Sequence, residues 1–138
     1  MTKEDKELLL KDLCARLLYG VVVHIHDINV DDYDRQLIPE DIDFIQLNRR
    51  DCKPYLRPMS SMTEEEKREL YNWLIEFDGN WFDFNKLINK LTFDKILIAF
   101  DNSWLLCDWL NKKQFDYHGL IPKGLAIEVT KENNPYLI

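Results

Sequence analysis

The sequence predicts an α+β fold: an N-terminal helix, a small antiparallel sheet that is open or barrel-like, two or three helices, and a short C-terminal strand. Three observations support this prediction. Leucines recur every four residues from Leu9 to Leu17, which is typical of an amphipathic helix. The short β-branched run Val21–His26 is typical of a strand. Thr63 and Glu66 have the spacing of a helix capping box.

The chain has 138 residues, an ordinary length for one domain, and 46% of its residues are hydrophobic. Such a composition is sufficient to form a core, which argues against an acidic disordered chain. No internal repeat or long linker divides the sequence. We therefore expect residues 1–138 to form a single globular domain.

The first helix is expected from about Thr2 to Leu18. Thr2 can cap its N-terminus, and Glu4 and Asp5 lie in the first turn, where negative charge is favourable. Its apolar residues form two adjacent rows on one face: Leu9, Leu13 and Leu17, then Leu10, Cys14 and Leu18. Three polar residues fall largely off this face: Lys11, Asp12 and Arg16.

The sheet is expected to follow the first helix. Val21–His26 is its first strand, and the acidic stretch Asp27–Arg35 is expected as a loop because it contains several turn-forming residues. The alternation of residue types over Ile42–Leu47 predicts a second strand, bounded by Pro39. Pro54–Pro58 predicts a short extended segment, because each proline pushes its preceding residue out of the helical region.

The second half of the chain is expected to be mainly helical. The capping box predicts a helix from about Glu64 to Phe77. A further helical face is expected between Asn80 and Leu91. Ile96–Phe100 fits either a buried strand or a helix, since periodicity does not separate the two.

The C-terminal region is expected to contain one more helix and one strand. Asp101 or Ser103 can cap a helix that runs through Leu110. Turn-forming residues follow, and Leu125–Val129 then predicts a short closing strand.

The net charge of the chain is concentrated in one stretch. The chain has 18 basic and 25 acidic residues, for a net charge of -7. Seven acids and one arginine lie between Asp27 and Asp43, so this stretch carries -6 of that charge. A nucleic-acid binder is therefore not expected, because phosphate contacts need clustered basic residues. The acids at Asp31, Asp32 and Asp34 are instead candidates for binding a basic partner.

A basic group comes directly after the acidic stretch. Its members are candidates for binding a nucleotide or another anion: Arg49, Arg50, Lys53, Tyr55 and Arg57. Arginine side chains match phosphate geometry, and a tyrosine ring can stack on a base. The alternative is that these cations only balance the preceding acids.

His24 and His26 are the metal-ligand candidates. Alternation along a strand places both rings on one face, about 7 Å apart. Asp27, Asp31 or Asp32 could add a carboxylate, but the motif fixes no third ligand. The alternative is an ordinary exposed strand face. No P-loop, GxSxG or HExxH motif is present, so no catalytic residue and no cofactor is assigned.

The compartment is expected to be the cytoplasm. The three cysteines, Cys14, Cys52 and Cys107, are odd in number and lack CxxC spacing, which favours reduced thiols. The polar N-terminus lacks the pattern of a signal peptide, and no apolar run is long enough to cross a membrane. No membrane partner is therefore expected.

Three long blocks resemble a group of small uncharacterised proteins that are abundant in gut bacterial genomes and in their prophages and phages. The blocks are LKDLCARL with YGV (Leu10–Leu17 and Tyr19–Val21), DCKPYLRPMSSMTEEE (Asp51–Glu66), and DWLN, FDYHGLI and GLA (Asp108–Asn111, Phe115–Ile121 and Gly124–Ala126). The sequence departs from the group mainly between Asp27 and Arg49 and between Phe77 and Trp104. The resemblance implies an accessory role on a mobile element, and it implies no reaction and no catalytic residues.

Three functions compete at this point. The first is a non-catalytic protein-binding module that acts on a host or phage protein, which suits the localised charge and the 12% aromatic content. The second is a small-ligand protein that binds or sequesters a nucleotide or other anion. The third is a metal-dependent enzyme that uses His24 and His26. The sequence leaves the oligomeric state open.

Overall fold

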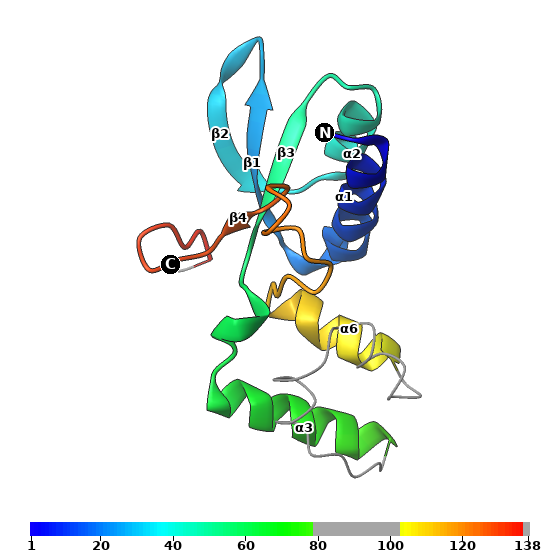
Figure 1. The fold of residues 1–138 in the computed structure, drawn as a ribbon, viewed down its shortest axis with the longest axis vertical. Helices are drawn as coiled ribbons and strands as arrows, with labels where there is room; N and C mark the ends of the chain where they lie inside the picture. The colour runs from blue at the N-terminus through cyan, green and yellow to red at the C-terminus, as the bar shows by residue number, and fades with distance from the viewer. Residues whose placement is uncertain (79–102, 137–138) are drawn as a thin grey trace.

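The computed structural model describes residues 1–78 and 103–136. Its helices and strands form an α+β fold, as predicted (Figure 1). The strands are β1 (Val22–Asp27), β2 (Val30–Gln36), β3 (Asp51–Leu56) and β4 (Ile127–Glu128). The α-helices are α1 (Lys3–Arg16), α2 (Pro39–Gln46), α3 (Glu64–Asp78) and α6 (Ser103–Lys112), and short 3-10 turns lie at Leu17–Tyr19 and Met59–Ser61.

The strands form one open sheet in the order β2-β1-β3-β4. β1 pairs antiparallel with both β2 and β3, whereas β4 pairs parallel with β3. The part of the sheet between Val22 and Leu56 is therefore antiparallel, as predicted, and the closing strand β4 joins it in parallel. The barrel-like alternative is also wrong, because β2 and β4 lie at opposite ends of the strand order and the sheet does not close.

One face of the sheet is covered by α1 and α2 (Figure 1). The core between these layers takes its side chains from both helices, from β1 and β3, and from the turn before β4: Leu9, Leu13, Ile45, Val21, Val23, Ile25, Cys52, Leu56, Leu120, Leu125 and Ala126. Val23 and Ile25 of β1 point into this core, as strand alternation requires. The even-numbered residues of β1 therefore lie on the opposite face.

The stretch predicted as the loop Asp27–Arg35 is mostly a strand, so that prediction is wrong. Only Ile28 and Asn29 form the turn, and the Asp27 carboxylate accepts a hydrogen bond from the Asn29 amide at 3.0 Å. Asp has low strand propensity, which is why the sequence pattern indicated a loop. Pairing with β1 overrides that propensity and makes Val30–Gln36 a strand.

The strand predicted at Ile42–Leu47 is also wrong, because these residues lie in and just after helix α2. Pro39 is the first residue of this helix, a position where a missing amide hydrogen costs nothing. Glu40 and Asp41 then lie in its first turn, where their charge is favourable. Pro39 therefore begins a helix and does not bound a strand.

Helix α1 lies where it was predicted, but its buried face differs from the predicted apolar face. Thr2 caps it by accepting a hydrogen bond from the Asp5 amide at 3.0 Å. Asp12 and Arg16, which fall off the leucine rows, are completely buried, whereas Leu18 is 93% exposed. The buried face thus combines Leu9 and Leu13 with an ion pair, which the leucine repeat did not predict.

The predicted C-terminal elements are confirmed where the structure describes them. In the capping box of α3, Thr63 and Glu66 exchange two hydrogen bonds of 3.1 Å. Helix α6 lies beside α3 beyond one end of the sheet (Figure 1). The closing strand is confirmed but is shorter than predicted. The predictions for Asn80–Leu91 and Ile96–Phe100 lie outside the described residues.

Candidate functional site

The face of the sheet opposite α1 and α2 carries a group of polar side chains, which we call the outer face. It consists of His24 and His26 from β1, Asp32 and Asp34 from β2, and Asp51, Lys53 and Tyr55 from β3. Strand register places these residues together, because His24 lies between Asp34 and Lys53, and His26 lies beside Asp51. Ile25 and Cys52, which alternate with these residues on β1 and β3, are buried in the core.

Hydrogen bonds join the histidines to the acids of β2. His24 contacts Asp34 through Nδ1 at 2.7 Å and Asp32 through Nε2 at 3.3 Å. His26 contacts the other oxygen of Asp32 through Nδ1 at 2.7 Å. The Tyr55 hydroxyl donates to Asp34 at 3.0 Å. The two acids thus link all three strands of the outer face, around a shallow hollow of about 390 Å³.

The structure separates the basic group that the sequence suggested as an anion site. Arg50 pairs with Asp41 at 2.9 Å and Asp27 at 3.4 Å. Arg57 lies at the far end of β3, where it pairs with both carboxylate oxygens of Glu66. Arg49 is exposed.

The other two candidates in the basic group, Lys53 and Tyr55, lie on the outer face among the histidines and acids. The five candidate residues therefore do not converge on one cavity. The three arginines point to different places, and only Lys53 and Tyr55 join the partner-binding candidates.

The partner-binding candidates are brought together in part. Asp32 and Asp34 lie side by side on the outer face, whereas alternation along the strand directs Asp31 to the other side of β2. All three are exposed. They therefore lie on one exposed strand, with two acids on one side of it and one on the other.

No family model, curated protein or solved structure matches this chain. Within residues 1–78 and 103–136, no helix is long and apolar enough to cross a membrane.

The metal-ligand candidates lie where the sequence predicted, on one face of β1. Among the described residues, however, no three histidine, cysteine, aspartate or glutamate side chains are arranged to hold a metal ion. The ring nitrogens of His24 are instead hydrogen-bonded to two carboxylates. Hydrogen bonds to Asp32 and Asp34 therefore hold both histidine rings in place.

The pKa values of His24 and Asp32 differ from the ordinary values of these residue types. The hydrogen bond to Asp34 raises the pKa of His24, with a further contribution from Asp32, and these outweigh the opposing effect of burial. The hydrogen bonds from His26 and His24 lower the pKa of Asp32. Asp32 therefore stays ionised to lower pH than a free aspartate, and His24 keeps its proton to higher pH than a free imidazole.

This displacement predicts a pH dependence of stability. Because the pKa of His24 is raised on folding, its contribution is fully present below the ordinary histidine pKa of about 6.5 and is lost as pH rises through the folded value. We expect the difference in unfolding free energy between the wild type and His24→Asn to shrink as pH rises. Urea titrations at a series of pH values measure it.

The matched control for that experiment is Gln36→Ala, which changes a non-titrating side chain on the edge strand β2. Its effect on the free energy of unfolding should stay constant over the same pH range. A His24→Asn difference that is equally constant would contradict the assigned role of the cluster.

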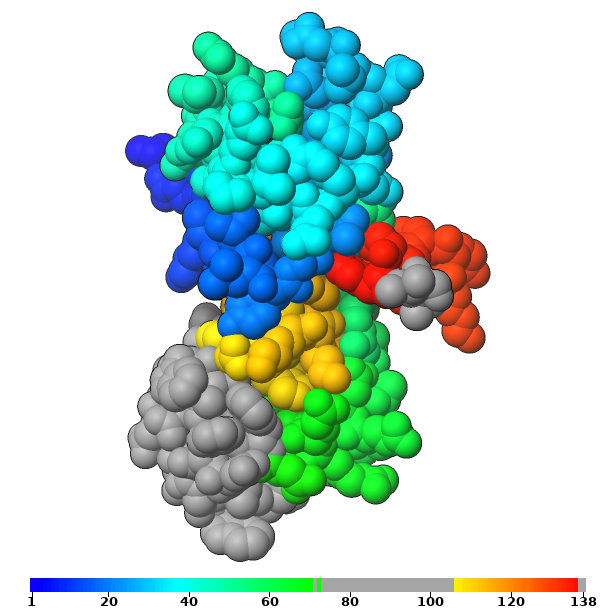
Figure 2. Space-filling view, turned by 180° about the vertical axis from the view of Figure 1, so that it is seen from behind, coloured from blue at the N-terminus to red at the C-terminus, as the bar shows by residue number. Residues whose placement is uncertain are grey.

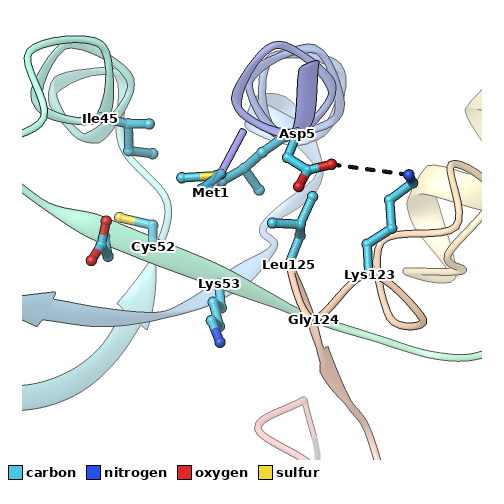
Figure 3. A pocket seen from close by; sticks show the side chains of 10 residues that line it. Met1, Asp5, Ile45, Cys52, Lys53, Lys123, Gly124 and Leu125 are labelled. Carbon is cyan, nitrogen blue, oxygen red and sulfur yellow. Dashed lines mark ion pairs between the residues drawn. The ribbon is translucent and has the colours of Figure 1, made fainter. Parts of the chain in front are cut away.

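A second cavity, of about 450 Å³, lies on the other side of β3 (Figure 3). Asp5 of α1 and Lys123 are 3.9 Å apart at its edge. Cys52 lies among its lining residues, and burial raises the pKa of this thiol to about 12, so the thiol is not a nucleophile near neutral pH. Lys53 points away from Met1 and Asp5 in this view. Lys53 is nevertheless among the lining residues, whereas Arg49, Arg50 and Arg57 are not.

The sequence contains a signal for the outer face that the periodicity of single strands does not reveal. Two histidines at alternate positions, His24 and His26, are followed by two acids at alternate positions, Asp32 and Asp34. A two-residue turn at Ile28 and Asn29 brings the two pairs together on one face. This spacing, read as a hairpin, would have predicted the cluster.

Proposed function

We propose that the chain is a non-catalytic protein-binding module that captures a basic surface of a host or phage protein through strand β2. The observation that carries the proposal is the exposure of this strand. Six of its seven residues are exposed, and Asp31, Asp32 and Asp34 are among them. Arg35 is the one basic residue on this strand. The exposed acids therefore attract a positively charged surface.

The hairpin that carries the acids also presents apolar side chains. Ile28 is 90% exposed at the turn, and Val30 is 54% exposed at the start of β2. The hairpin stands at one end of the molecule in Figures 1 and 2. Two aliphatic side chains next to acids fit a protein surface that has a small apolar patch beside basic residues. This combination favours a protein partner over a nucleic acid.

The resemblance to phage and prophage proteins supports the proposed setting, which is the cytoplasm of a bacterial host. Binding of this kind needs no reaction, and the proposal assigns none. Sequestration of a nucleotide or other anion is the alternative. The pairing of Arg50 with Asp41 and of Arg57 with Glu66 counts against it, because these pairs hold the two guanidinium groups at separate places, so they do not face one anion together.

Neutralising the acids of β2 tests the proposal. We expect the triple variant Asp31→Asn, Asp32→Asn and Asp34→Asn to bind a lysine-rich peptide roughly tenfold more weakly than the wild type, since each opposite-charge contact contributes about 0.2–1 kcal/mol. Isothermal titration calorimetry at low and high salt measures the affinity. High salt should weaken the wild type most.

The matched control neutralises three exposed acids elsewhere: Glu4→Gln, Glu7→Gln and Glu65→Gln. Both triple variants remove three negative charges from the net -7, so they change the net charge equally but at different positions. The control should bind like the wild type. An equal loss in both variants would show attraction by overall charge, and no loss in either would exclude β2 as the site. A nucleotide-dependent rise in melting temperature would favour the alternative.

A further inference from the structure

Strand β2 lies at the edge of the sheet. It begins the strand order β2-β1-β3-β4, and in the part of the chain that the structure describes it pairs only with β1. Figure 1 shows it along one margin of the sheet. An edge strand of seven residues presents unpaired backbone amides and carbonyls, which another extended segment can pair with.

The ladder between β1 and β2 shows which backbone groups face outward. The Leu37 amide donates to the Val21 carbonyl at 2.9 Å, which fixes the alternation of paired and unpaired residues along β2. Because every second residue is paired in this way, the backbone amides and carbonyls of Arg35 and Tyr33 also face β1. Asp34 and Gln36 therefore direct their backbone amides to the free edge.

The Gln36 carbonyl supports this assignment. It accepts a hydrogen bond from the Arg35 side chain at 3.1 Å, so it is not used in the ladder. The outward amides of Asp34 and Gln36 are the two donors that an added strand would use.

The charges on β2 select what can pair with this edge. Asp32 and Asp34 lie on the outer face at alternate positions, and Tyr33, 36% exposed, lies between them on the other side. A second copy of this strand would place acids near acids, which is unfavourable across a sheet. A strand with lysine or arginine at alternate positions would place a cation beside each acid and an apolar residue near Tyr33.

We propose that the partner binds by adding a strand to β2: an extended segment with basic residues at alternate positions and apolar residues between them. This inference rests on the proposed function and specifies its geometry. Main-chain hydrogen bonds supply affinity in such a complex, and the alternating cations supply specificity. The acids of β2 thus disfavour strand pairing between two copies of the chain and favour pairing with a basic strand.

Three peptides of equal charge test the added strand. The first alternates lysine and valine. The second is the same peptide with its valine amides N-methylated. The third has its lysine amides N-methylated instead, and it tests the opposite register. We expect one of the two methylated isomers to bind roughly tenfold more weakly than the unmodified peptide, because it loses the hydrogen bonds that face β2. Fluorescence anisotropy measures the three affinities.

Gln36→Pro is the matching change in the protein, because it removes one outward amide and no charge; proline is tolerated where an edge-strand amide faces solvent. Its control is Gln36→Ala, which keeps the amide. We expect weaker peptide binding for the proline variant alone, with a circular dichroism spectrum like that of the wild type. If proline disturbs folding, the methylated peptides still decide the question.

The outcomes separate this inference from the proposed function. Equal binding of all three peptides, with loss of binding on neutralising Asp31, Asp32 and Asp34, would overturn the added strand and leave capture by charge intact. Binding of no peptide would overturn both. Concentration-dependent dimers that Gln36→Pro dissociates, measured by analytical ultracentrifugation, would identify a second copy as the occupant and overturn the inference.

Discussion

Replacing Asp12 with alanine is expected to lower the free energy of unfolding by about 3–5 kcal/mol. Asp12 and Arg16 have no exposed surface, and they lie one turn apart on α1. The Arg16 Nε donates to Asp12 at 2.7 Å, and His118 contacts the other carboxylate oxygen at 2.7 Å. Without Asp12, a buried guanidinium would lose its counter-charge, which is far more costly than the loss of a surface pair.

The surroundings of Arg16 show why this charge has no route to water. Its guanidinium donates to the Phe115 carbonyl and lies 4.9 Å from the centre of the Tyr117 ring. Burial alone would raise the pKa of Asp12, but the hydrogen bond from His118 and the charge and hydrogen bonds of Arg16 outweigh it and lower that pKa. Its contribution to stability is therefore present above the ordinary aspartate pKa and is lost as pH falls through the folded value.

Two further variants make this prediction specific. Glu7→Ala removes an exposed acid from the same helix and should change stability by less than about 0.5 kcal/mol. The double variant Asp12→Leu with Arg16→Met should recover much of the loss, since it removes both charges. Chemical denaturation measures all three. A loss below about 1 kcal/mol for Asp12→Ala would contradict the account of the buried pair.

Replacing Asp41 with alanine is expected to cost about 2–3 kcal/mol and to weaken peptide binding. Asp41 is completely buried at the start of α2. Its carboxylate accepts from Arg35 of β2 at 2.6 and 2.8 Å, and from Arg50 at 2.9 Å. It also accepts from the Ile38 amide at 3.1 Å, so one side chain joins the edge strand, the helix and the start of β3.

The expected loss is smaller than at Asp12 because Arg35 and Arg50 keep some contact with water. Asp43→Ala, an exposed change on the same helix, is the control and should have little effect on stability. Denaturation and peptide titration measure the two variants. Full stability and full affinity in Asp41→Ala would show that Asp41 does not position β2.

Sequence reasoning predicted the elements whose signals are local. The capping box of Thr63 and Glu66 predicted α3, and Thr2 with the leucine repeat predicted α1, because caps and periodicity act within a few residues. Both lie where expected. The β-branched run before His24 likewise predicted β1.

The errors came from contacts between distant residues. β2 is a strand because it pairs with β1, and the acids that lower its strand propensity bind His24 and His26 across the hairpin. The burial of Arg16 depends on Phe115, which is 99 positions away in the sequence. Likewise, the scattering of Arg50 and Arg57 depends on partners outside their own segment, Asp41 and Glu66.

The central claim is that β2 is the binding surface. Mapping where the basic peptide binds on isotopically labelled protein tests this claim most directly. The account predicts that backbone amide NMR signals of Val30–Gln36 shift as the alternating lysine–valine peptide is added. The amides of Asp34 and Gln36 should become protected from hydrogen exchange. Signals of α3, which begins with three glutamates, should stay in place. Shifts centred on Glu64–Glu66, or spread evenly over all acidic residues, would contradict the account.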